Sequence, residues 1–189
     1  MKKFLLGAVA AASVVLSPVA MASSPYIAAT GGLPVTFTGS FNVFKGISIT
    51  NCAVTFVLNG PNNAGDGHIP SPHTDLSNAY VQSLALAGGS PPLCGPGVVY
   101  VSSGAVEYAS TNTNGLAGVL TVRNLLIDTP LTPGGCFDDI QAVWNEGEQT
   151  LTFGGLLDPF DPATAPCNFV GTLIPDRYVD FSAPGDAGH

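Results

Sequence analysis

The stretch Gly134–Ile174, GGCFDDIQAVWNEGEQTLTFGGLLDPFDPATAPCNFVGTLI, decides the fold class of this chain. It opens on Cys136 after a pair of glycines, and its last apolar run begins just after Cys167. Short runs in which apolar residues recur at every second position, or in which β-branched and aromatic residues dominate, are typical of β-strands. The stretch therefore predicts a β unit enclosed by two cysteines. Three such runs lie in it: Ile140–Trp144, Thr150–Phe153 and Phe169–Ile174.

An earlier part of the chain repeats this arrangement, because Cys52 and Cys94 flank two β-like runs between residues 53 and 87. An even number of cysteines in an exported chain indicates disulfides. Four cysteines allow three pairings, and we favour Cys52–Cys94 and Cys136–Cys167 because each pair encloses one β unit. Each bond closes a loop of tens of residues, which is worth about 3–4 kcal/mol of unfolding free energy. A metal site would need closely spaced pairs such as C-x-x-C, and the sequence has none.

The N-terminus predicts export. Lys2 and Lys3 precede the apolar run Phe4–Leu16, and small residues lead to a cleavage site after Ala22. We expect residues 1–22 to be a signal peptide and residues 23–189 to form a single β domain whose tail frays from about residue 182. The protein is then secreted, to the extracellular space or the cell surface, with the periplasm as the alternative. No later stretch is long and apolar enough to be a transmembrane segment.

The charge of the exported part is strongly negative. Three basic residues, Lys45, Arg123 and Arg177, face thirteen carboxylates, a net charge of −10. Because nucleic-acid binding requires clustered cations, this balance excludes DNA and RNA as expected partners.

The remaining chain continues the β pattern, with Gly and Pro between short apolar runs. Residues 37–44 alternate from Phe37 onward, and residues 116–127 form the longest β run. The segment between Asp75 and Gly89 fits either a short helix capped by Asp75 or a strand, and we favour the strand. About eight to ten short strands result, which predicts an all-β antiparallel sandwich or sandwich-like barrel.

A polar loop, residues 62–75, is the first candidate site. It brings together imidazoles and carboxylates, which are ligands for zinc or copper. The spacing of the two histidines does not form a tight ligand pair, so an ordinary acidic loop is the favoured interpretation. The residues in question are Asp66, His68, His73 and Asp75.

A second candidate consists of four aspartates around the Cys136–Cys167 unit. Such a group could bind calcium or supply a carboxylate pair for glycoside hydrolysis. The sequence has no EF-hand motif, and aspartate before proline commonly starts a turn, so turns are the favoured interpretation. The four residues are Asp138, Asp139, Asp158 and Asp161.

Aromatic side chains are the third candidate, since exposed rings on a sheet would suit sugar or hydrocarbon. Trp144 shares a strand face with Ile140 and Ala142, so core packing is favoured for it. The chain has no G-x-S-x-G, S-x-x-K or phosphate-binding glycine motif. We therefore expect no enzymatic activity and assign no catalytic, cofactor-binding or metal-binding residue. The other rings considered are Tyr80, Tyr100, Tyr108 and Tyr178.

The chain resembles the small secreted proteins named for activating alkane oxidation, the PraB type. The likeness lies in FTGSFNVFKG followed by ISITNCAVTFVLNG (residues 37–60), in GGCFDDIQAVWNEGEQTLTF (residues 134–153) and in CNFVGTLI (residues 167–174). It covers most of residues 37–174. The resemblance implies an extracellular, cell-surface or biofilm-matrix protein linked to growth on hydrocarbon, whose partner is an apolar substrate or surface. It carries over no catalytic residue.

Two other hypotheses remain open. One is self-association into fibres by β-strand pairing, with the segment Tyr26–Val35 as the added strand. The other is an exported module that binds a ligand or calcium through the acidic residues.

Overall fold

The computed structural model describes residues 25–62, 73–90, 94, 97–101, 105–111, 116–127, 135–159 and 161–182. Nearly all of them lie in β-strands, and the helical element among them is the single 3-10 turn η1 (Leu76–Asn78). The predicted signal peptide and the last seven residues fall outside the described residues. The strands are β1 Tyr26–Ala29, β2 Val35–Lys45, β3 Ile47–Asn59, β4 His73–Asp75, β5 Tyr80–Ser90, β6 Gly97–Val101, β7 Val106–Ser110, β8 Ala117–Ile127, β9 Cys136–Asn145, β10 Thr150–Leu157, β11 Cys167–Pro175 and β12 Val179–Ser182.

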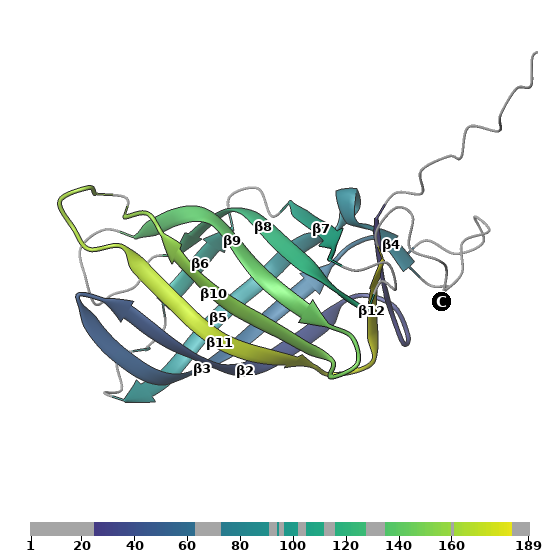
Figure 1. Ribbon diagram of the computed structural model, residues 1–189, viewed down its shortest axis with the longest axis horizontal. Helices are drawn as coiled ribbons and strands as arrows, with labels where there is room; N and C mark the ends of the chain where they lie inside the picture. Colours follow the sequence, from purple (N-terminus) through teal and green to yellow (C-terminus); the bar gives the residue numbers. More distant parts are fainter. Residues whose placement is uncertain are drawn as a thin grey trace, which may run out of the picture.

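Nine strands form one antiparallel sheet in the order β6-β5-β3-β2-β11-β10-β9-β8-β7. Residues 99–101 of β6 also pair with residues 125–127 of β8, so the sheet curls round until its ends meet there (Figure 1). Farther along β8, β7 takes the place of β6 and pairs with residues 118–122. Between β5 and β7 the described ladder is reduced to the single bridge Tyr80–Ala105, which leaves a seam in the curled sheet.

A second sheet of three strands, in the order β12-β1-β4, covers one end of the curled sheet (Figure 1). Its central strand β1 pairs with both neighbours: Ala28 opposes Asp180 on β12 and Ile27 opposes Thr74 on β4. Ile27, Val179 and Thr74 are fully buried. The segment that the fibre hypothesis would donate to a neighbouring molecule is thus paired within its own chain.

Aromatic rings fill the interior of the curled sheet. Trp144 is 0% exposed and meets Phe37 edge-on, with ring centroids 6.4 Å apart. Phe56 lies between Phe37 and Phe153, at centroid distances of 5.8 Å and 5.9 Å. Because burial of one large apolar side chain is worth about 1.5–3 kcal/mol, the burial of these rings stabilises the fold. The prediction that Trp144 packs in the core is confirmed.

Both predicted disulfides are present. Cys136 and Cys167 are the first residues of β9 and β11, so their bond passes across the end of β10, the strand between them. Cys52 lies on β3 and holds Cys94, in the connection between β5 and β6, against the sheet. The predicted all-β antiparallel fold, a sandwich or sandwich-like barrel with two disulfides, is confirmed.

The strand count is higher than predicted, since the described residues contain twelve strands. The additional strands are β1 and β4, which have four and three residues and no alternating pattern of their own. The segment between Asp75 and Gly89, which fitted either a helix or a strand, is mostly strand. Its first three residues after Asp75 form the 3-10 turn η1, and Tyr80–Ser90 is strand β5. Asp75 makes no side-chain cap bond to η1.

Candidate functional site

Asp139 is held by an ion pair with Arg123. The carboxylate accepts hydrogen bonds from the Arg123 guanidinium at 2.5 Å and from the backbone N–H of Asn124 at 2.8 Å. These contacts, the Asn124 N–H above all, lower the pKa of Asp139. Asn124 has a positive φ of 53°, at the irregularity where β8 shifts its register against β9. The Asp139 carboxylate thus stabilises the strained backbone at Asn124, which is a structural role.

Arg123 also pairs with Glu107 on β7, at 2.7 Å. The two hydrogen bonds to carboxylates raise the pKa of the guanidinium. All three side chains are between one third and three fifths exposed, and ion pairs at such positions contribute little to stability. We call Arg123, Glu107 and Asp139 the ion triad. It marks the outer side of β7, β8 and β9 as the charged part of the sheet.

The other three aspartates of the second candidate site take part in hydrogen bonds with backbone N–H groups. Asp138 accepts the N–H of Asp139 at 2.7 Å, and Asp161 accepts the N–H of Ala163 at 2.9 Å, as in an ordinary aspartate turn. Asp158 uses its carbonyl to accept the N–H of Phe137. Among the described residues, no group of three or more His, Cys, Asp or Glu is placed to hold a metal ion.

The 62–75 loop candidate falls largely on residues 63–72, which are outside the described residues, and Asp66 and His68 are among them. His73 and Asp75 are described as the ends of β4, where they pair in register with Ala28 and Tyr26 of β1. The structure therefore places two of the four residues in the small sheet.

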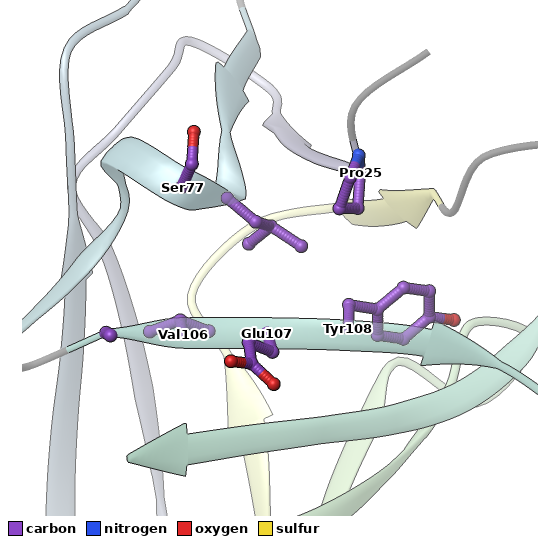
Figure 2. A pocket seen from close by; sticks show the side chains of 7 residues that line it. Pro25, Ser77, Val106, Glu107 and Tyr108 are labelled. Atoms are coloured by element: carbon purple, nitrogen blue, oxygen red, sulfur yellow. The ribbon is translucent and has the colours of Figure 1, made fainter. Parts of the chain in front are cut away.

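A hollow of about 420 Å³ lies beside the seam, between η1 and β7. Figure 2 shows Pro25 and Ser77 on one side of it and β7 on the other, with the Glu107 carboxylate turned away from Pro25. Glu107 is engaged by Arg123, and the Tyr108 ring stacks on Phe181 at 5.4 Å. The lining is mostly apolar, and its one carboxylate, Glu107, is paired with Arg123. The full lining is Pro25, Leu76, Ser77, Ala105, Val106, Glu107 and Tyr108.

The remaining surface of the large sheet is distinctive for its lack of charge. The five neighbouring strands β5, β3, β2, β11 and β10 contain one charged residue, Lys45, which is 5% exposed. We call the outer face of these five strands the uncharged wall. Many of its residues are small and neutral, as in the cross-strand row Ala53, Ser40, Thr172 and Thr152. The chain has thirteen carboxylates, so the uncharged wall is a neutral area on a strongly acidic protein.

The five strands of the uncharged wall carry six exposed large apolar side chains, and three of them lie close together. The six are Phe44, Ile47, Tyr80, Leu156, Val170 and Ile174. Phe44 on β2, Val170 on β11 and Leu156 on β10 are 47%, 49% and 64% exposed. Asn168 opposes both Phe44 and Leu156 in the register, and Val170 lies two residues farther along the same strand. Diagonal neighbours at this offset lie about 7–8 Å apart, so the three side chains adjoin. We call them the apolar triangle.

The local geometry makes the apolar triangle prominent. Gly154 opposes Val170, and neither Gly154 nor Gly155 has other atoms within 4 Å of the place where a Cβ would stand. Gly154 shares the outer face with Leu156, whereas Gly155 alternates onto the core side with Phe153 and Leu157, so the open space beside Val170 and Leu156 is the one at Gly154. The sequence analysis did not single out these residues, although alternation along β10 and β11 does place both on the face opposite the core.

The aromatic candidates divide between core and surface. Trp144 and Tyr108 are buried, while Tyr80 and Tyr178 are about half exposed. The side chain of Tyr100 is outside the described residues. The exposed tyrosines lie away from the apolar triangle, on the first residue of β5 and just before β12.

No helix in the described residues has the length and hydropathy needed to cross a membrane. Comparisons of the chain with protein-family models, with curated proteins and with solved structures found no match.

Proposed function

We propose that this chain is a secreted, non-enzymatic protein of the cell surface or extracellular matrix that helps cells contact hydrocarbon or other apolar surfaces. The observation that carries this proposal is the uncharged wall on a strongly acidic protein. The resemblance to secreted activators of alkane oxidation points in the same direction, and the two disulfides are consistent with an extracellular protein.

A protein surface that comes against a medium of low dielectric constant loses its contact with water. Removing a charged group from water costs several kcal/mol or more, whereas a neutral hydrogen-bonded surface loses far less. The uncharged wall can therefore approach an apolar phase, while the ion triad on β7, β8 and β9 stays in water. The disulfides Cys52–Cys94 and Cys136–Cys167 stabilise the fold at the interface, because they reduce the conformational entropy of the unfolded chain.

The structure describes no set of groups that would suit an enzyme better. The hollow beside η1 has an apolar lining, and its one carboxylate, Glu107, is paired with Arg123. The calcium-binding alternative depended on Asp138 and Asp139, and Asp139 is engaged by Arg123 and Asn124. Strand donation by Tyr26–Val35 would require breaking the pairing of β1 with two neighbours.

The test uses mature, oxidised protein, residues 23–189, mixed with hexadecane droplets. We expect the protein to be depleted from the aqueous phase, and to be depleted more strongly as salt is added, because salt screens the repulsion between adsorbed molecules of net charge −10. Circular dichroism of the desorbed protein should show an unchanged β spectrum. A protein that neither adsorbs to droplets nor associates with cells or matrix would contradict the proposal.

A further inference from the structure

We propose that Glu146 and Asp180 form a binding site for a calcium ion, at the joint between the small sheet and the curled sheet. None of the four aspartates of the second candidate site takes part in it. This inference goes beyond the proposed function, because it gives the chain a ligand that does not depend on contact with an apolar surface.

Gln149 fixes the turn between β9 and β10 against β12, beside which the turn lies in Figure 1. Its side-chain oxygen accepts the N–H of Val179 at 2.8 Å, and its side-chain nitrogen donates to the Val179 carbonyl at 3.0 Å. Glu146 belongs to this turn, and its carboxylate accepts a hydrogen bond from the Tyr178 hydroxyl. Tyr178 and Asp180 flank Val179, so alternation puts their side chains on the same side of the strand. The fold thus holds the two carboxylates beside one phenol.

Both carboxylates are buried, since Glu146 and Asp180 are each 6% exposed. The Oε1 atom of Glu146 accepts the Tyr178 hydroxyl, whereas its Oε2 atom is buried and has no hydrogen-bond partner. Burial of a carboxylate is costly, and buried charges in proteins are therefore paired with an opposite charge or bound to a metal ion. The Oε2 atom of Glu146 thus indicates a ligand that carries positive charge.

The charges that reach the Tyr178 hydroxyl are both negative. The hydrogen bond to Glu146 is the largest cause that raises the pKa of Tyr178 to about 12, and the charges of Glu146 and Asp180 raise it further. A phenol responds in this way to carboxylates that lie close to it. A cation placed between the two carboxylates would therefore interact with both.

The three basic side chains of the described residues are engaged or distant from Glu146. Arg123 belongs to the ion triad, and Arg177 bonds to Asp176 at 2.8 Å. Lys45 is the last residue of β2, at the hairpin with β3, and roughly 30 Å of strand separates it from the end of β2 that adjoins the small sheet. The counter-charge for Glu146 is therefore expected from solution.

Calcium suits this group of oxygen atoms. It binds carboxylates in one- or two-oxygen geometry and completes a flexible shell with water, whereas magnesium requires a strict octahedron and loses its water reluctantly. Tyr178 is 54% exposed, so the phenol side of the site borders the solvent and gives the ion a path to the carboxylates. Because only two carboxylates contribute, we expect a Kd in the range of extracellular calcium modules, about 0.1–1 mM.

The first measurement is urea unfolding of the full mature protein in chelator and in calcium chloride, at equal ionic strength. We expect about 10 mM calcium to raise the folding equilibrium constant of native protein about 10- to 100-fold. Glu146→Gln and Asp180→Asn each remove a ligand charge and should reduce this effect to less than about twofold. The matched control is Glu148→Gln, which removes the same charge from an exposed side chain of the same turn and should keep the full effect.

The second measurement needs no variant and applies if Glu146→Gln or Asp180→Asn does not fold. Bound calcium offsets the two negative charges, so the pKa of Tyr178 in native protein should fall from about 12 toward its ordinary value of 10. Tyrosinate absorbance, recorded with chelator and with calcium, follows this titration.

Three outcomes would overturn the calcium site. Native protein could show neither the stabilisation nor the fall in the pKa of Tyr178. Magnesium could stabilise it as much as calcium at the same ionic strength, or Glu148→Gln could lose the effect as fully as Glu146→Gln; in either case the ions act on the net charge of the chain. Loss of the effect in Glu146→Gln and Asp180→Asn alone supports the site. Droplet adsorption tests the proposed function separately, and none of these outcomes changes that test.

Discussion

The rings of Phe41 and Phe153 pack against each other with centroids 5.3 Å apart, although β11 lies between their strands β2 and β10. The residue of β11 that opposes both of them is Gly171. Since glycine has no side chain, the two rings can meet above the middle strand. This contact fastens three strands of the uncharged wall from the inside.

The first prediction concerns Gly171→Ala. A Cβ at this position would overlap the Ser40 carbonyl oxygen and the Phe41 ring, so the strands must separate. We expect the free energy of unfolding, measured by chemical denaturation, to fall by about 1–3 kcal/mol, as in overpacked cores. The matched control is Gly154→Ala on β10, where the space around a Cβ is open and the change should stay within about 0.5 kcal/mol. Equal effects at both glycines would contradict the argument.

The second prediction concerns the joint between the two sheets. Phe181 of β12 meets Trp144 of β9 edge-on at a centroid distance of 5.2 Å, and both are fully buried. Phe181→Ala should cost about 3–5 kcal/mol of unfolding free energy, because it leaves a cavity between the sheets. The exposed Val143→Ala on β9 is the control and should change it by less than about 0.5 kcal/mol.

Hydrogen exchange locates the effect of Phe181→Ala. Amides of β1 and β12 should exchange faster relative to those of β2 and β11, because the small sheet loses its contact with the core. Uniform acceleration over all strands would show that the small sheet and the curled sheet unfold as one unit.

Sequence reasoning succeeded where a single strand carries the whole pattern. Alternation around Ile140, Ala142 and Trp144 placed the indole in the core, and the β unit enclosed by each cysteine pair predicted the correct disulfides. The sequence pattern did not decide between helix and strand from Asp75 to Gly89, and the structure shows the reason. A register shift of β3 against β5 puts Val81 and Leu84 on the same face, three residues apart as in a helix.

The candidate site was less accessible to sequence reasoning, because it depends on which strands are neighbours. Phe44 and Leu156 are more than a hundred residues apart in the chain, and only the register through Asn168 brings them together. The aspartates show that neighbours in the sequence need not form one site. Asp138 and Asp139 are adjacent in sequence, yet one binds its neighbour's backbone and the other binds Arg123.

The third prediction concerns acid and the ion triad. The pKa of Asp139 is lowered from its ordinary value of 3.8, so its contacts stabilise the fold above that value and lose this effect as the pH falls through the lowered pKa. The unfolding free energy of native protein should therefore exceed that of Asp139→Asn above about pH 4, and the difference should shrink in stronger acid. A difference that stays constant down to the acid transition would contradict this account.

A further variant separates the causes of the Asp139 shift. Arg123→Met removes the guanidinium but keeps the N–H of Asn124, which is the larger cause. The pKa of Asp139, followed by NMR, should rise in this variant and remain below its ordinary value. Full recovery of the ordinary pKa would assign the shift to Arg123 alone.

The fourth prediction concerns base. The Tyr178 hydroxyl donates a hydrogen bond to the carboxylate of Glu146, a buried side chain in the turn between β9 and β10. This bond, together with partial burial and the charges of Glu146 and Asp180, raises the pKa of Tyr178 to about 12. An ionised phenol would lose the bond and face two carboxylates, so the protonated form is the one that the fold stabilises.

The sign of the pH dependence follows from this raised pKa. The contribution of Tyr178 is fully present below pH 10, the ordinary value, and is lost as the pH rises to about 12. Native protein should therefore lose its stability advantage over Tyr178→Phe between these values, and tyrosinate absorbance should show one late-titrating phenol that Tyr178→Phe removes. Glu146→Gln, which keeps an acceptor oxygen and removes the charge, should return the pKa toward 10. A phenol that titrates at the same pH with and without the Glu146 charge would refute the assignment, because the hydrogen bond to that carboxylate is the largest cause of the shift.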